Sequence, residues 1–225
     1  MGWIEHDHDT TEALIAHVAA AFARACGDAI RARGHAFLAL AGGRTPLPIY
    51  KALAASADAR GISAIPTDER CVPHDHPACN LRALREAFGD SGIKTLALTL
   101  DDGTPETTTL AAHPQDFDAV LLGMGADGHF ASLFPFAENL RDGLVPDAAD
   151  AIATLPVPLP PEAPFARVSL TLQRLLRARE IHLVVTGDDK RRVLRAAQQQ
   201  DDGAGLPIAA LLHARSRSVQ IHWSP

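Results

Sequence analysis

A glycine-rich segment carries the side chains best suited to chemistry. Residues 123–129 read Gly-Met-Gly-Ala-Asp-Gly-His and follow the apolar run 119–122, which has the length and content of a buried strand. Glycine lets the backbone turn sharply and approach a ligand closely. His129 can then take a proton from water, while Asp127 orients the ring, holds a substrate hydroxyl, or only forms a turn. We expect residues 130–134 to form a short helix whose dipole favours the neutral imidazole.

A second candidate site is the turn Gly42-Gly43-Arg44-Thr45. It lies between an apolar strand expected at 35–41 and a helix expected to begin at Pro46. A strand, a glycine turn and a helix together point backbone N–H groups and a helix dipole at an anion. The turn has neither the GxxxxGK[ST] nor the GxGxxG spacing, so a plain connection is the alternative.

A charged cluster, Asp68-Glu69-Arg70, ends a strand expected at 61–67. These side chains either line a site or form a surface ion network, and for Glu69 we prefer the surface network. Asn80 is the expected N-cap of the next helix. Further along the chain, Arg167 and Lys190 taken alone have the usual character of solvated charges.

Other residues that suggest chemistry have simpler explanations. His6 with His8, and His74 with His76, lack Cys or carboxylate partners at a zinc spacing, so we interpret them as loop histidines and expect no metal site. Ser132 is not in a GxSxG motif, which favours a packing or capping role.

The order of apolar runs and helical patterns defines the elements that must position these residues. Strands and helices alternate along the chain, with strands expected at 95–100, 180–186 and 219–223 among others. This alternation predicts one domain over residues 1–225: a three-layer Rossmann-like α/β fold whose mostly parallel sheet has helices on both faces. Ligands of such a sheet bind outside the carboxyl ends of its strands.

Composition limits the classes of partner. The chain has 225 residues, a net charge of −6 and a pI near 6.0, which argues against nucleic-acid binding and anionic membranes. We find no apolar run of membrane-spanning length and no signal peptide. Three cysteines give no disulfide framework. We therefore expect a cytoplasmic protein.

Four blocks taken together resemble the 6-phosphogluconolactonases, in the wider group that includes glucosamine-6-phosphate deaminase. The blocks are Gly42-Gly-Arg-Thr-Pro46; Asp68-Glu-Arg-Cys-Val-Pro73 with Asn80; Leu122-Gly-Met-Gly-Ala-Asp-Gly-His-Phe-Ala-Ser-Leu-Phe-Pro135; and Arg167 with Lys190. The resemblance spans nearly the whole chain, and the third block is the specific one.

The resemblance implies an enzyme of the oxidative pentose phosphate pathway that hydrolyses 6-phospho-D-glucono-1,5-lactone to 6-phosphogluconate. A lactone is an activated ester, so the reaction needs a base and oxyanion donors but no metal or cofactor. His129 would be the base, and Arg70 would serve the oxyanion or the phosphate. The phosphate would lie on Gly42, Gly43, Arg44 and Thr45 with Arg167 and Lys190, while Asp68 would hold sugar hydroxyls or Arg70.

Several residues depart from the group's pattern, and two alternatives follow from the group itself. Ala41 and Arg44 replace the usual serines of the phosphate loop, Cys79 replaces a serine before Asn80, and Pro66 interrupts a strand. The first alternative is a deaminase or isomerase, although deaminases carry Asn-Glu-Pro where this chain has Ser132-Leu-Phe-Pro. The second is a non-catalytic sugar-phosphate-binding protein. For oligomeric state we expect a monomer or a weak homodimer.

Overall fold

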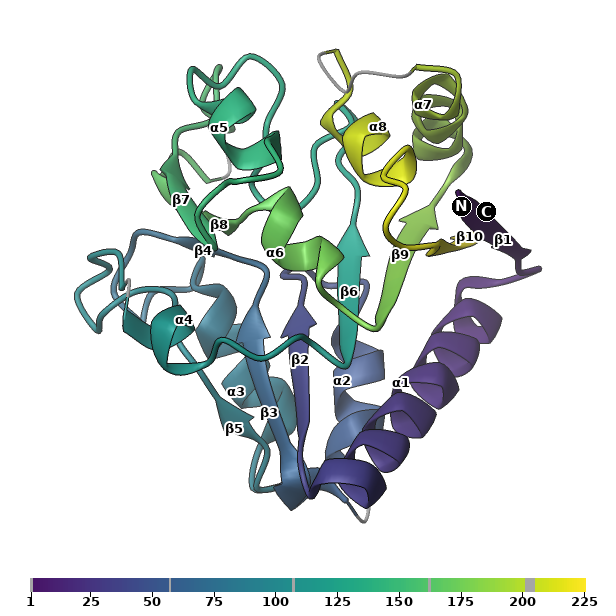
Figure 1. Cartoon of the computed structure of the whole chain (residues 1–225), viewed down its shortest axis with the longest axis vertical. Helices are drawn as coiled ribbons and strands as arrows, with labels where there is room; N and C mark the ends of the chain where they lie inside the picture. Colours follow the sequence, from purple (N-terminus) through teal and green to yellow (C-terminus); the bar gives the residue numbers. More distant parts are fainter. Residues whose placement is uncertain (1, 57, 107, 162, 201–204) are drawn as a thin grey trace.

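The apolar runs form a seven-stranded sheet in which every neighbouring pair of strands is parallel (Figure 1). The computed structural model describes residues 2–56, 58–106, 108–161, 163–200 and 205–225. In sheet order the strands are β1 (Trp3–Asp7), β10 (Val219–Ser224), β9 (Glu180–Thr186), β6 (Ala119–Gly123), β2 (Ala36–Leu40), β3 (Ile62–Pro66) and β5 (Lys94–Thr95). The predicted α/β class is therefore confirmed.

Helices cover both faces of this sheet. One face packs against α1 (Thr11–Arg33), α2 (Leu47–Ala54) and α3 (Asn80–Phe88). On the other side lie α4 (Thr108–Ala112), α5 (Leu140–Leu144), α6 (Leu172–Leu176), α7 (Asp188–Gln198) and α8 (Pro207–Leu212); a short 3₁₀ turn, η1, spans Ala59–Gly61. Alternate side chains of each strand point to opposite faces, so Leu38 packs towards α1 whereas Phe37 and Ala39 pack on the opposite side.

The long helix α1 corrects one expectation. By length and composition, its 23 residues are apolar enough to cross a membrane, whereas we predicted no run of membrane-spanning length. In the fold, Leu14, Val18 and Phe22 are fully buried against the sheet. The apolar stretch is thus accounted for by a core helix, which sequence hydropathy does not separate from a membrane span.

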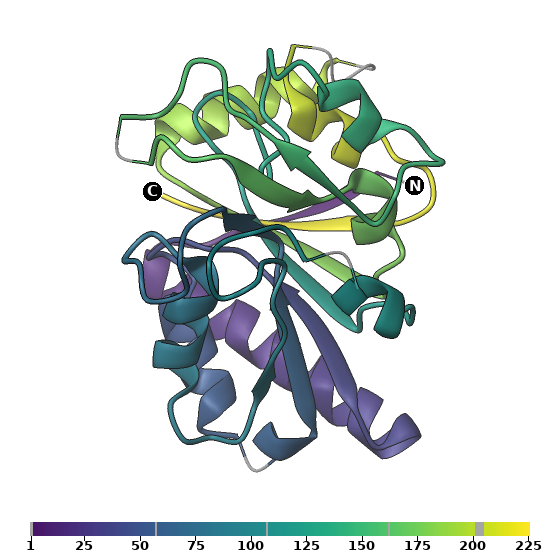
Figure 2. The same ribbon diagram turned by 90° about the vertical axis from the view of Figure 1, so that its left-hand side faces the viewer.

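A second, smaller sheet was not predicted. Its three antiparallel strands are β4 (Asp68–Arg70), β8 (Arg167–Leu170) and β7 (Ala151–Thr154). It lies with α5, α7 and α8 in the upper half of the molecule in Figure 2, while α1–α3 fill the lower half. Only Thr67 separates β3 from β4, so the chain passes directly from the large sheet to the small one.

Two local predictions were wrong in extent. The strand expected at 95–100 is only the two-residue β5, because its later residues turn away to pair Thr99 with Pro105. The interpretation of His6 as a loop histidine was wrong, because it lies in β1, the short edge strand expected at residues 3–6; His74 and His76 do lie in a loop, as expected.

The order of the strands determines where a ligand can bind. From β2 the chain proceeds outwards through β3 to β5, and from the adjacent β6 it proceeds in the other direction through β9 to β10. The connections after β2 and β6 therefore separate at their carboxyl ends and leave a crevice between them. Residues 41–46 follow β2 and residues 124–129 follow β6. The two segments that carry the candidate phosphate-binding turn and His129 therefore meet at this crevice.

Candidate active site

A cavity of about 310 Å³ occupies this crevice. Of the residues singled out from sequence, the following line it: Gly42, Gly43, Arg44, Thr45, Asp68, Arg70, His129, Arg167 and Lys190. Asp127 does not line the cavity but contacts His129 from behind. Residues more than 140 positions apart in the chain thus share one concave surface.

The turn after β2 presents unused hydrogen-bond donors to the cavity. None of the backbone N–H groups of residues 42–45 donates to an acceptor within the described residues. Gly42 must lack a side chain because a Cβ there would collide with the amide of Asn80. Arg44 is exposed and has no ion pair among the described residues. The turn can therefore hold an anion with backbone donors and one added cation.

His129 is held by a short hydrogen bond. Its Nδ1 lies 2.5 Å from Oδ1 of Asp127, and its backbone N–H donates to the same oxygen at 3.2 Å. The Phe134 ring packs on the imidazole with a centroid separation of 4.3 Å. A Cβ at Gly125 would overlap the His129 ring, so glycine is needed there. A neutral imidazole that donates from Nδ1 to Asp127 keeps the lone pair of Nε2 for a proton.

Asp127 is kept ionised beside this ring. Burial raises the pKa of its carboxyl, but the hydrogen bonds and charge of His129 outweigh burial and lower the pKa below its ordinary value. A carboxylate in this position favours an imidazolium that forms on His129, which is the charge a general base acquires.

The helix expected at residues 130–134 is absent. Phe130 and Leu133 form an isolated bridge instead, and Ala131 has a φ of 48°. The helix-dipole explanation for a neutral His129 is therefore wrong, and the contact with Asp127 instead orients the ring and favours the imidazolium that forms when His129 takes a proton. A left-handed alanine costs conformational energy and lies in the cavity wall.

Two arginines lie side by side without a carboxylate. Arg70 of β4 is the register partner of Arg167 of β8, and neither forms an ion pair with any described residue. Arg70 donates from Nη1 to the Ala78 carbonyl at 2.6 Å, while its Nε is buried and has no acceptor. Burial, and then the charge of Arg70, lowers the pKa of Arg167. Because like charges in register repel each other, this pair is suited to an anion between them.

Asp68 is fixed by neighbours that the sequence did not suggest. Ser132 Oγ donates to Asp68 Oδ2 at 2.5 Å, and Asn80 Nδ2 donates to the Asp68 carbonyl oxygen at 2.8 Å. Ser132 N–H in turn donates to Ser169 Oγ at 3.0 Å, so the segment after His129 is joined to two strands of the small sheet, β4 and β8. Asp68 makes no hydrogen bond to Arg70, which leaves sugar hydroxyls as the better of its two expected roles.

The prediction of a surface Glu69 was wrong. Its carboxylate is fully buried and accepts the N–H groups of Arg70 at 2.8 Å, and of Asn80 and Leu81 at 2.7 Å each. Burial raises its pKa despite these bonds. The N-cap of α3 is Cys79 rather than Asn80. Glu69 therefore fixes the start of α3 against β4, and a run of three charged residues in sequence gives no signal of this role.

Lys190 completes the cavity from the first turn of α7, which follows β9 through Gly187. It has no ion pair with any described residue. Within the described ranges, no three His, Cys, Asp or Glu side chains are arranged to hold a metal ion. The cavity thus combines the free N–H groups at 42–45, several cations and one imidazole–carboxylate pair.

Comparison with known proteins gives consistent matches over the full fold. Residues 9–223 match the family described as glucosamine-6-phosphate isomerases/6-phosphogluconolactonase. A 6-phosphogluconolactonase of Pseudomonas putida is 36% identical over 97% of this chain and 90% of its own length. One of Mesorhizobium japonicum is 35% identical over 88% of this chain and 85% of its own. The crystal structure of a 6-phosphogluconolactonase from Shewanella baltica superposes with a TM-score of 0.91 at 33% identity, covering 99% of this chain and 98% of that one.

Proposed function

The chain belongs to the glucosamine-6-phosphate isomerase/6-phosphogluconolactonase family, and from this premise we propose that it hydrolyses 6-phospho-D-glucono-1,5-lactone to 6-phosphogluconate. The observation that carries the proposal is the single cavity that unites the turn at 42–45 with His129. A phosphate and an ester carbonyl on one hexose can contact both at once.

We assign the phosphate to the turn at 42–45, with Lys190 as a cation. The free N–H groups and the ammonium group hold it equally in substrate and transition state, so they supply affinity. Arg44 takes the part of the serine hydroxyl that the related proteins use. Its exposed guanidinium reaches the phosphate from solvent, which accommodates the departure from the family's loop.

The chemical step begins with water. His129 Nε2 takes one proton as the water oxygen attacks C1 of the lactone, and the carbonyl oxygen becomes an oxyanion. Arg70 stabilises that charge with its guanidinium, because it lines the cavity and forms no ion pair with a described residue. The intermediate collapses as the ring oxygen leaves and receives the proton from His129. The new carboxylic acid then loses its proton to solvent.

Asp127 keeps Nδ1 protonated and stabilises the transient imidazolium across 2.5 Å. Asp68, held by Ser132 and Asn80, orients a sugar hydroxyl. No step in this sequence requires a metal, a cofactor or a covalent intermediate, because a lactone is already activated.

The deaminase alternative is less well supported. Ring opening of an amino sugar needs a further acid where deaminases carry Asn-Glu-Pro. Phe134 stands in that segment and its ring lies on His129, so an apolar group occupies the place of a carboxylate. A glucosamine-6-phosphate assay that gave turnover comparable to lactone turnover would favour the deaminase.

The test is hydrolysis of lactone generated in situ by glucose-6-phosphate dehydrogenase. We expect rapid lactone loss with the parent protein and a fall of about 10²–10⁴-fold in kcat for His129→Ala. His35→Ala is the matched control, because His35 is exposed and does not line the cavity. Hydrolysis by His129→Ala at the parent rate would remove His129 as the base.

Two further expectations complete the proposal. We place the enzyme in the cytoplasm, where a phosphorylated sugar would be retained. We also expect a monomer or a weak homodimer, which sedimentation at several concentrations would test.

A further inference from the structure

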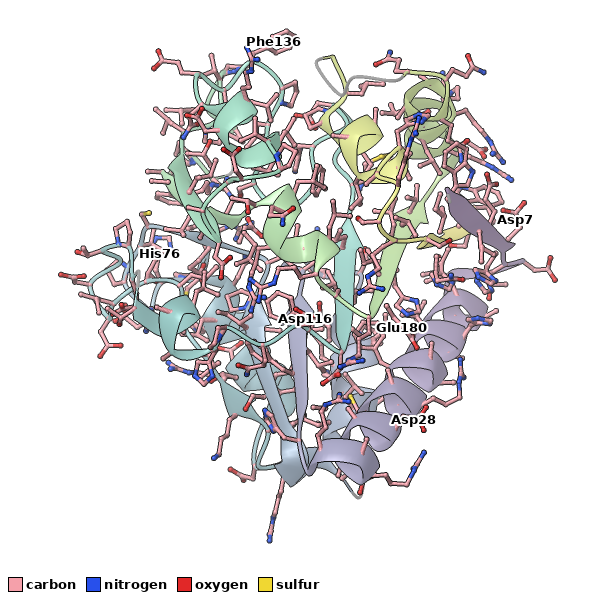
Figure 3. The ribbon with its side chains drawn as sticks, viewed as in Figure 1. Asp7, Asp28, His76, Asp116, Phe136 and Glu180 are labelled. Carbon is pink, nitrogen blue, oxygen red and sulfur yellow. The ribbon has the colours of Figure 1, made fainter. Side chains whose placement is uncertain are left out.

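A second concave surface lies away from the catalytic cavity, between α1 and the strands β9 and β10. Its volume is about 480 Å³. Figure 3 labels Glu180 at the start of β9, beside α1, and Asp7 at the end of the edge strand β1. The catalytic cavity uses the other end of β9, at Val184 and Thr186. The two concavities therefore share a strand but, in the part of the chain that the structure describes, no lining residue.

Three guanidiniums line this surface. They belong to Arg24 of α1, Arg179 before β9 and Arg217 before β10. Arg24 and Arg217 are exposed and form no ion pair with a described residue. Arg179 pairs with Asp118 at 3.3 Å, but Asp118 also pairs with Arg33 and so divides its charge between two arginines. Among the described residues, the wall has one carboxylate, from Glu180, against three cations, in a chain whose net charge is −6.

Four imidazoles also line this surface. They are His6, His17, His182 and His222, and His8 contacts the group from the end of β1. His6, predicted to be a loop histidine, lies with its ring 4.8 Å from that of His222. The side chains come together because His6 and His222 are register partners and His182 lies on the same face of the next strand.

Hydrogen bonds fix the direction of four of these rings, those of His6, His8, His182 and His222. His182 Nε2 donates to Glu180 at 3.2 Å, so its Nδ1 accepts from His222 Nε2 at 3.0 Å. His222 Nδ1 is then the acceptor for His8 Nε2 at 3.4 Å. His6 Nε2 donates to the side-chain oxygen of Gln220 at 2.8 Å. The ring nitrogens are thus directed at one another and not at a common point.

This arrangement favours a negatively charged ligand over a positively charged one. A divalent cation needs several nitrogens that converge, and it would lie among three guanidiniums that repel it. An anion instead gains charge-assisted hydrogen bonds from Arg24 and Arg217, which have no partner in the described chain. We propose that this surface is a second anion site, which binds a small phosphorylated compound with two or more negative charges.

Binding should be coupled to protonation. The His17 side chain is partly desolvated although the residue is exposed, and this desolvation, together with the neighbouring imidazoles and Arg24, lowers its pKa. An anion between Arg24 and Arg217 offsets the repulsion between these positive groups and a protonated His17. The His17 ring therefore takes up a proton as the anion binds. The groups that face His17 are His6 and His8 on the side of β1, His182 on β9, His222 on β10 and Arg24 on α1. Since these are imidazoles and a guanidinium, the affinity for the anion rises as the pH falls.

Isothermal titration with inorganic pyrophosphate tests the proposal. Pyrophosphate also fits the catalytic cavity, so the number of sites is the first readout. The parent protein should bind one more pyrophosphate than the double variant Arg24→Ala/Arg217→Ala, whose affinity at this surface should fall about 100-fold, or about tenfold for each guanidinium. Arg215→Ala is the matched control: it is equally exposed and two residues away, but lines a different concavity.

The ratio of the parent's affinity to that of His17→Gln should be about tenfold larger at pH 6 than at pH 8, a comparison that cancels the protonation of pyrophosphate itself. The same stoichiometry and affinity in the double variant as in the parent would overturn the proposal. An equal loss of pyrophosphate affinity in Arg215→Ala would also overturn it. Tight binding of Zn²⁺ to the parent, without the additional pyrophosphate, would show that the imidazoles form a cation site instead. Both arginines are exposed, so the variants should fold as the parent does.

Discussion

Replacing Asp127 with asparagine changes one hydrogen bond and one charge. Asp127 Oδ1 accepts from His129 Nδ1 at 2.5 Å, and a hydrogen bond to a charged group contributes about 1.5–3 kcal/mol. Because the Asp127 side chain is 47% exposed, solvent screens part of this hydrogen-bond energy, and we take the lower half of the range. A loss of about 1.5–2 kcal/mol in transition-state stabilisation corresponds to a fall of about 10–30-fold in kcat/KM.

The pH dependence of Asp127→Asn gives a second readout. The variant lacks the negative charge that favours an imidazolium, so the acidic limb of the kcat/KM profile should move to lower pH. Lactone hydrolysis between pH 5 and 8 measures both effects. Asp28→Asn serves as the control, because Asp28 pairs with Arg31 on the solvent side of α1 and both side chains are more than 70% exposed. A variant within twofold of the parent at every pH would show that Asp127 does not assist His129.

Lys190→Ala should raise KM about tenfold with little change in kcat, since the phosphate is held alike in ground and transition states; an unchanged KM would remove Lys190 from the site. Glu69→Gln should lower the free energy of unfolding by about 2–3 kcal/mol, because three backbone N–H groups lose a buried carboxylate. Urea denaturation measures this, with the exposed Glu86→Gln expected to change it by under about 0.5 kcal/mol. Burial and then His182 lower the pKa of His222 to about 2, so below pH 6.5 the unfolded chain takes up a proton that the folded protein does not. Stability should therefore fall by about 2 kcal/mol between pH 7 and pH 5, and His222→Gln should lose less than the parent over that interval. Equal losses in the two proteins would contradict the neutral state of His222.

The centre of the large sheet could be predicted because β2, β3, β6 and β9 are short, mostly apolar runs between turn residues. Parallel strands buried on both faces have this signature, and the segment 119–122 shows it clearly. The place of the cavity followed from the same rule, since glycine turns after β2 and β6 must meet at the carboxyl ends. The small sheet gave no such signal, because β4 consists of Asp68, Glu69 and Arg70 and its stability comes from pairing with a distant strand.

Side-chain environments were harder to predict than strands. Glu69 is buried because backbone N–H groups from the start of α3 converge on it, and those contacts depend on tertiary structure. The segment after His129 contains apolar residues at helical spacing, but Ser132 is drawn to Asp68 and the turn closes instead. The histidines of β1 and β10 are 214 or more positions apart, so their group could not be seen before the strand order was known.

The central claim is that one sugar phosphate contacts the turn at 42–45 and His129 at the same time. A crystal structure with 6-phosphogluconate bound tests it most directly. We expect the phosphate on the N–H groups of residues 42–45, with Lys190 beside it and the C1 carboxylate within hydrogen-bonding distance of His129 Nε2. A phosphate bound elsewhere, or a carboxylate directed away from His129, would contradict the assignment of this cavity as the active site.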